Sequence, residues 1–211
     1  MYIIAMLTML IDHAGIVFAP HQEIWRIIGR FAMPIYAYCL VVGYKHTRSK
    51  KKYIQRLAMI AALSQLPFVF AFQTVGINNV GTLLVCFLVL VFLDRYKEHP
   101  ASWLVLIPAL VLLEVLPFDY GAYGLLLVLF YRYLDSHTLV LAHIGLNILY
   151  VFYKGWAIQM YSIFPTMLLV YWPSVYALLD KVKVKRWIWR SFYPAHLAVL
   201  AAFQLASQWF K

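Results

Sequence analysis

The chain has 211 residues, of which 64% are hydrophobic, 18% aromatic and only 12% charged, and its formal net charge is +10. This composition excludes an ordinary soluble globular domain, in which about 25% of the residues are charged. The Lys and Arg residues lie in short hydrophilic breaks between apolar runs, so membrane topology explains the positive charge better than a nucleic-acid partner does.

Nine apolar segments predict an all-α, polytopic membrane helix bundle. In chain order they cover roughly residues 2–19, 24–44, 55–73, 80–94, 102–117, 121–134, 138–153, 160–179 and 191–209. Several segments are shorter than the roughly 20 residues that an untilted helix needs to cross the hydrocarbon core, so tilted or re-entrant elements would change the count to about eight or ten. Neither an internal repeat nor a long linker divides the sequence, and we expect residues 1–211 to form a single domain.

The basic residues predict the orientation of this bundle. If the N-terminus is cytoplasmic, all Lys and Arg residues except Arg26, Arg30, Lys154 and Lys211 fall on the cytoplasmic side. Such a bias is typical of multi-pass proteins, whose cytoplasmic loops are enriched in Lys and Arg. We therefore expect a multi-pass protein with a cytoplasmic N-terminus, surrounded by membrane lipids.

Ionisable residues interrupt the first two apolar segments: Asp12 and His13 in the first, and Arg30 in the second. Such a group at bilayer depth costs about 2.5–3.5 kcal/mol, so it usually faces a polar interior and marks a functional site. Side chains of neighbouring residues diverge by about 100° around a helix, so Asp12 and His13 need separate partners. We expect Arg30 to bind Asp12, because a guanidinium group matches a carboxylate. The alternative is a buried ion pair that only sets helix register.

His13 is a candidate general base, because an imidazole with a reference pKa of about 6.5 accepts a proton near neutral pH. The alternative is a core histidine that is hydrogen-bonded to a neighbouring helix. At a rise of 1.5 Å per residue, His13 lies about 16 Å from the cytoplasmic end of its segment, and His196 of the ninth segment only about 7 Å. A hydrogen bond between them is therefore not expected: they serve opposite ends of one tunnel, or a segment is miscounted.

Asp119 lies at the outer junction of the fifth and sixth segments. It could cap the sixth helix, or it could face an outer mouth and orient His13 or the ammonium group of an acceptor. Polar residues inside other segments, among them Asn79 and Asn147, either line a tunnel or join helices.

Motifs from the first segment to the last resemble the TraX family. They are LIDH at 10–13, GRFAMPI at 29–35, GYKHTR at 43–48, SQLPF at 64–68, DYG at 119–121 and FYPAHL at 192–197. They follow the family's order and cover nearly the whole chain. The family is associated with N-terminal acetylation of pilin and is similar to other multi-pass acyltransferases with an intramembrane histidine.

The resemblance implies an integral membrane acyltransferase of a bacterial cytoplasmic (inner) membrane, with acetyl-CoA as co-substrate. The acceptor would be an amine, such as a peptide N-terminus, or a hydroxyl, at or across the membrane. His13 is the expected base, and Asp12, Arg30 and Asp119 complete the expected catalytic set. Direct transfer and an acyl-histidine intermediate both remain open.

Acyl-CoA would arrive at the hydrophilic segment between the second and third apolar segments. The residues that we expect to bind it are the cations Lys45, Arg48, Lys52 and Arg56 together with His46, Tyr193 and His196. Positive-inside topology and anionic lipids explain the same basic cluster. On similar grounds the basic residues at 181–190, with Trp187 and Trp189, predict an interfacial anchor without a substrate role.

A small proton-coupled transporter that uses the buried Asp, His and Arg residues is the competing interpretation, and it would be expected to use Glu114 as well. A structural or assembly subunit is a third class. No metal site is predicted. The acceptor, the acyl chain length and the oligomeric state stay open.

Overall fold

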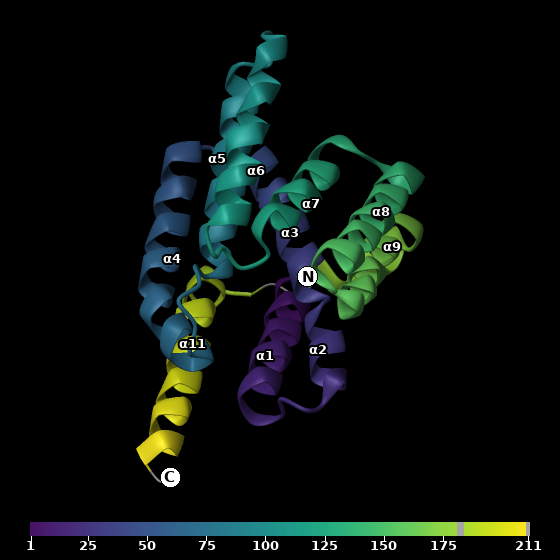
Figure 1. Ribbon diagram of the computed structural model, residues 1–211. Helices are drawn as coiled ribbons and strands as arrows, with labels where there is room; N and C mark the ends of the chain where they lie inside the picture. The colour runs from purple at the N-terminus through teal and green to yellow at the C-terminus, as the bar shows by residue number, and fades with distance from the viewer. Residues whose placement is uncertain (181–183, 210–211) are drawn as a thin grey trace.

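The described part of the chain, residues 1–180 and 184–209 of a computed structural model, is a helix bundle (Figure 1). Its helices are α1 (Tyr2–Phe18), α2 (Glu23–Gly29), α3 (Ala32–His46), α4 (Lys50–Phe72), α5 (Asn79–Arg95), the 3-10 helix η1 (Pro100–Val105), α6 (Leu106–Val115), α7 (Gly121–Tyr133), α8 (Ser136–Lys154), the 3-10 helix η2 (Ala157–Ser162), α9 (Ile163–Tyr171), α10 (Pro173–Asp180) and α11 (Arg186–Trp209). Lys181, Lys183 and Lys211, which contributed to the predicted orientation, lie outside the described residues.

Within the described residues, three helical units are long and apolar enough to cross a membrane: Glu23–His46, which joins α2 to α3, then α4, and α8. Only 17% of the apolar window of α4 is buried inside the protein, and large side chains such as Leu63, Leu66 and Phe70 are exposed on it. Exposed apolar surface of this extent marks an interaction with lipid or protein. The expectation of an all-α membrane bundle is thus supported, whereas the number of crossings stays a prediction.

The predicted segment 24–44 is one unit in sequence but two helices in the structure. The helical path is interrupted at Arg30 and Phe31, between α2 and α3. Pro34 explains the break, because it has no N–H to donate to the carbonyl of Arg30 four residues earlier, and its ring crowds that carbonyl. The interruption leaves Arg30 at the end of α2, inside the bundle.

The main apolar core lies between α3, α5 and α7. Met33 of α3, Phe87 and Leu90 of α5, and Tyr123 and Leu127 of α7 are fully buried there. In a bilayer such helices are held together by close packing and by hydrogen bonds between helices.

A second group of helices, α1, α4 and α11, packs beside this core (Figure 1). Met9 of α1, Phe68 of α4 and Leu197 of α11 are buried against one another in one cluster. The helix α11 begins at Arg186, five residues before the expected boundary at 191.

Candidate functional site

Two histidines from opposite ends of the sequence meet between α1 and α11. Nδ1 of His13 lies 2.8 Å from Nε2 of His196, and the two residues are only 7% and 8% exposed. The expectation that they do not share a hydrogen bond is therefore wrong. Because α11 begins at Arg186, His196 lies about 15 Å along its helix, which nearly equals the depth of His13, about 16 Å along α1.

A backbone contact decides which nitrogen of each ring carries the proton. Nδ1 of His196 lies 2.7 Å from the carbonyl oxygen of Phe192, one turn earlier in α11. A carbonyl only accepts, so Nδ1 of His196 is protonated and Nε2 of the neutral ring accepts. Nδ1 of His13 then donates to His196. This arrangement leaves Nε2 of neutral His13 as the atom that can take up a proton.

The carboxylate of Asp12 lies between two guanidinium groups. Nη1 of Arg26 is 3.0 Å and Nη2 of Arg30 is 3.1 Å from Oδ1 of Asp12. The expected ion pair with Arg30 is present, whereas Arg26 was expected only to face the outside. Arg26 and Arg30 are four residues apart and so lie on one face of α2, a spacing that could have indicated both.

Gly29 permits this ion cluster to form. A Cβ atom at Gly29 would collide with the side chain of Asp12, because the backbone of α2 lies directly against α1 at this point. A residue without a side chain is therefore needed where the two helices come closest.

Arg30 also joins a buried hydrogen-bond network between α7, α8, η2 and α9. Nη1 of Arg30 donates to Oε1 of Gln159 over 3.2 Å, and Nε2 of Gln159 donates to the hydroxyl of Tyr123 over 3.1 Å. The Tyr123 hydroxyl donates to Oδ1 of Asn147 over 2.8 Å and lies 3.0 Å from Nε2 of His143. Sequence reasoning missed Gln159, Tyr123 and His143. These residues were hard to identify from the sequence, because each is a single polar residue in an apolar segment.

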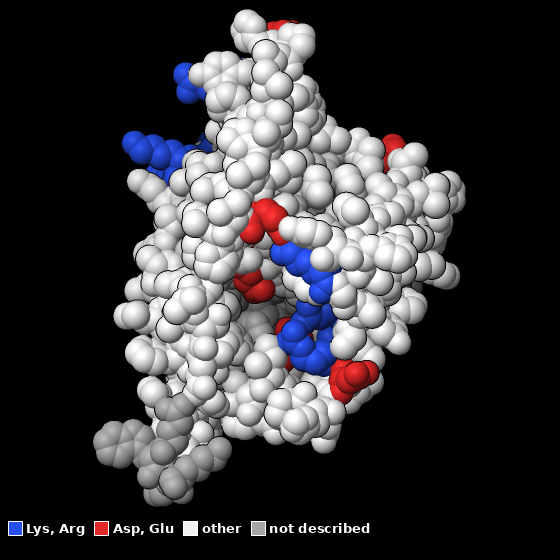
Figure 2. Space-filling model, viewed as in Figure 1, with Lys and Arg blue, Asp and Glu red and all other residues white. Residues whose placement is uncertain are grey.

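A cavity of about 610 Å³, the histidine cavity, holds His13 and the ion cluster. Its charged lining residues are Asp12, Glu23, Arg26, Arg30 and Asp119. Figure 2 shows acidic and basic side chains gathered around a central hollow, while the other charged side chains visible on this face lie toward its upper edge.

Asp119 lines the histidine cavity together with His13, as its predicted position at an outer mouth requires. The residue at the N-cap of α7 is Tyr120, and its side chain makes no capping bond, so the structure does not support a capping role for Asp119. Burial raises the pKa of the Asp119 carboxyl to about 6, although Arg30 lowers it in part. Asp119 therefore exchanges its proton close to neutral pH.

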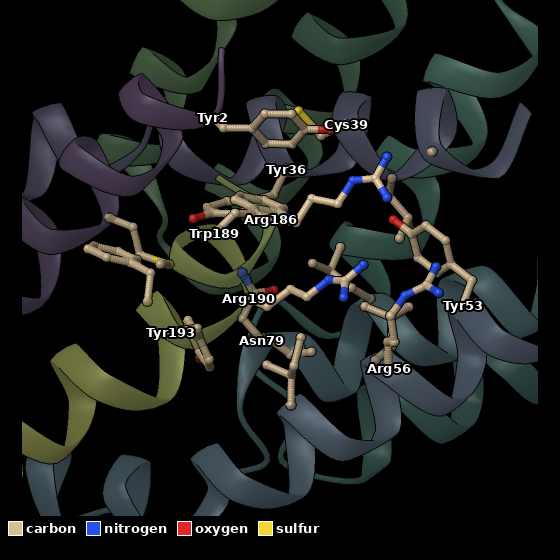
Figure 3. Close-up of a pocket in the computed structure, with 18 of the residues that line it drawn as sticks. Tyr2, Tyr36, Cys39, Tyr53, Arg56, Asn79, Arg186, Trp189, Arg190 and Tyr193 are labelled. Carbon is tan, nitrogen blue, oxygen red and sulfur yellow. The ribbon is translucent and has the colours of Figure 1, made fainter. Parts of the chain in front are cut away.

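A second cavity of about 550 Å³, the arginine cavity, lies between the first halves of α1, α4 and α11 and the sides of α3 and α5. Figure 3 shows Arg56, Arg186 and Arg190 extending into it. Tyr193, predicted to bind the donor, also lines it. Met9 and Asn79 line both cavities, which are therefore adjacent.

The residues that were expected to bind acyl-CoA lie in different parts of the structure. Arg56 and Tyr193 line the arginine cavity, and His196 binds His13. The other four are exposed near the turn between α3 and α4 and are not among the lining residues of either cavity: Lys45, His46, Arg48 and Lys52.

Apolar helices with exposed apolar faces around a buried group of His, Asp and Arg residues define a helical, membrane-type protein with a polar internal site. The TraX protein family matches residues 1–204, so the chain belongs to the TraX family, as its motifs predicted. Over 70 residues it is 33% identical to a probable fimbrial assembly protein, FimC of serogroup H1, from Dichelobacter nodosus. That match spans 31% of this chain and 28% of the relative. No solved structure matches the chain.

Proposed function

We propose that the protein is an integral membrane acyltransferase that moves acetyl from acetyl-CoA to an amine or a hydroxyl. The observation that carries this proposal is the His13–His196 pair. Its hydrogen bonds leave Nε2 of His13 as a proton acceptor beside a cavity that is large enough for a small substrate.

His13 can carry the proton through the whole acyl transfer without a second acid or base. The acceptor nitrogen or oxygen attacks the thioester carbonyl carbon while Nε2 of His13 takes up the acceptor's proton. The C–S bond then breaks, and His13 returns that proton to the leaving thiolate, so the products are an amide or ester and free CoA. His196 holds the ring of His13 in place throughout.

Charge beside the base supports this chemistry. Arg26 and Arg30 lie in the same cavity as His13, and a guanidinium group beside the reacting carbonyl stabilises the negative oxygen of a tetrahedral intermediate. Glu114, which a transporter was expected to use, instead forms an ion pair with Lys154 and is not among the residues lining the histidine cavity. This pairing favours the transferase over the transporter.

The acceptor that we propose is the N-terminal amine of an exported peptide. The relative from Dichelobacter nodosus is a probable fimbrial assembly protein, and fimbriae are built from exported subunits. We further propose a cytoplasmic N-terminus in a bacterial inner membrane, with donor and acceptor entering from opposite sides. The basic turn between α3 and α4 supports this orientation.

Acyl transfer by the detergent-purified chain tests the proposal. With acetyl-CoA and a short peptide that has a free N-terminus, we expect thiol release and an acetylated peptide. The His13→Ala variant should lose at least about 100-fold in rate, since a general base contributes about 10²–10⁴-fold. His21→Ala, on the exposed turn after α1, is the control. If neither transfer nor thermal stabilisation by any CoA species occurs, the acyltransferase is excluded.

A further inference from the structure

Three arginines from two distant parts of the chain converge on the arginine cavity. Arg56 comes from the first half of α4, and Arg186 and Arg190 come from the first turns of α11 (Figure 3). Among the described residues that line this cavity there is no carboxylate. It thus differs from the histidine cavity, where Asp12 offsets the guanidinium groups. Guanidinium groups of this kind bind phosphate oxygens through paired hydrogen bonds.

Aromatic rings lie next to these cations. The rings of Tyr36 and Trp189 stack with centroids 5.5 Å apart and planes 19° from parallel, and the ring of Tyr2 lies 4.4 Å from that of Trp189 at an angle of 53°. A planar base stacks favourably on an aromatic ring. Cations and aromatic rings in one cavity are complementary to a nucleotide that carries several phosphates.

The arginine cavity leads toward the histidines. Asn79 lines both cavities, is only 8% exposed, and its Oδ1 has no hydrogen-bond partner among the described residues. A buried amide oxygen without a partner costs free energy unless a ligand donates to it. The pantetheine arm of CoA carries amide N–H groups that could supply this bond.

We propose that the arginine cavity binds the phosphate-bearing nucleotide end of acyl-CoA, with Arg56, Arg186 and Arg190 as phosphate ligands. The pantetheine arm then passes Asn79 and Met9 and brings the thioester to His13. This inference rests on the proposed acyltransferase function. It also assigns a substrate role to α11 residues that, from sequence, were expected only to anchor the protein at the interface.

The test measures binding of CoA, dephospho-CoA and acetyl-pantetheine to detergent-purified native chain and to Arg56→Gln and Arg190→Gln. Each variant should bind CoA about 10- to 100-fold more weakly, since a hydrogen bond to a charged group is lost. Affinity for acetyl-pantetheine, which has no nucleotide, should not change. Arg48→Gln and Lys52→Gln remove cations outside the cavity and should bind CoA like the native chain.

Phosphate on a lipid headgroup offers the same chemistry as a nucleotide. We therefore repeat the titration with phosphatidylglycerol in place of CoA. If both cavity variants keep native affinity for CoA, or lose affinity only for phosphatidylglycerol, the nucleotide site is overturned while the acyltransferase proposal stands. If the native chain binds no CoA species, the nucleotide site and the acyltransferase proposal are both overturned.

Discussion

At the scale of single residues, the site depends on how His13 is held. His196 is itself held by the carbonyl of Phe192, so the His13 ring is aligned by two successive hydrogen bonds. Aligned pairs of this kind are how proteins select the tautomer of a histidine. Neither bond requires His196 to touch a substrate, so we assign it a positioning role.

We expect His196→Ala to lower kcat for acetyl transfer by about 10- to 100-fold, because partners that orient a functional histidine contribute about that much. KM for acetyl-CoA should stay close to the native value, since the proposed donor site lies elsewhere. Steady-state kinetics measure both quantities, and His21→Ala again serves as the control. A raised KM with unchanged kcat would instead place His196 in the donor site, as the sequence suggested.

The two arginines around Asp12 should differ in what they contribute to stability. The side chain of Arg30 is 13% exposed and also binds Gln159, whereas that of Arg26 is 33% exposed. Removing one partner of a buried ion pair costs about 3–5 kcal/mol, but an exposed pair contributes about 0–1 kcal/mol. Arg30→Gln should therefore lower the melting temperature much more than Arg26→Gln does. Equal losses in thermal unfolding would show that both arginines hold Asp12 equally.

At the scale of helices, the contact between α1 and α2 determines the shape of the histidine cavity. Gly29 brings α2 against Asp12, and the break before α3 lets Arg30 turn inward. The two features act together. If the helix continued straight through Arg30, the guanidinium groups would point in a different direction relative to Asp12.

Gly29→Ala should separate α1 from α2 and destabilise the protein by about 1–3 kcal/mol, the usual cost of overpacking. The matched control is Gly145→Ala in α8, where an added Cβ meets nothing within 4 Å. Alanine is the better helix former by about 0.5–1 kcal/mol, so the control should be neutral or slightly stabilising. Thermal unfolding in detergent compares the two. A Gly29→Ala variant as stable as the control would refute the close approach.

At the scale of the whole molecule, the two cavities lie toward different ends of α1 and α4. Tyr2 and Arg56, in the first halves of α1 and α4, line one cavity, and His13 and Phe72, in the second halves of the same helices, line the other. Such an arrangement suits a donor and an acceptor that come from separate compartments.

Labelling of single cysteines tests this orientation. His21 and Arg48 lie in exposed turns at opposite ends of the unit Glu23–His46. In a background with Cys39→Ser and Cys86→Ala, a membrane-impermeant maleimide should label His21→Cys in intact cells. It should label Arg48→Cys only after the membrane is opened. Labelling of both positions in intact cells would contradict the proposed topology.

Composition and motifs alone predicted the class of the protein, its family and the polar residues around which a site could form. Long apolar runs and short basic breaks predict membrane helices, because hydrocarbon demands apolar side chains and satisfied backbone hydrogen bonds over a fixed length. The pairing of Asp12 with Arg30 followed from charge alone, since neither would be stable unpaired at that depth.

Only the tertiary structure decided which distant residues meet. His13 and His196 are 183 residues apart, and their contact depends on where α11 starts and how it is rotated. In the same way the fold added Arg26 to the ion cluster and brought Arg186 and Arg190 opposite Arg56. The periodicity of the sequence specifies which face of a helix is apolar. It does not specify where the helix begins and ends or which helices it packs against. Those are set by side-chain packing over the whole bundle.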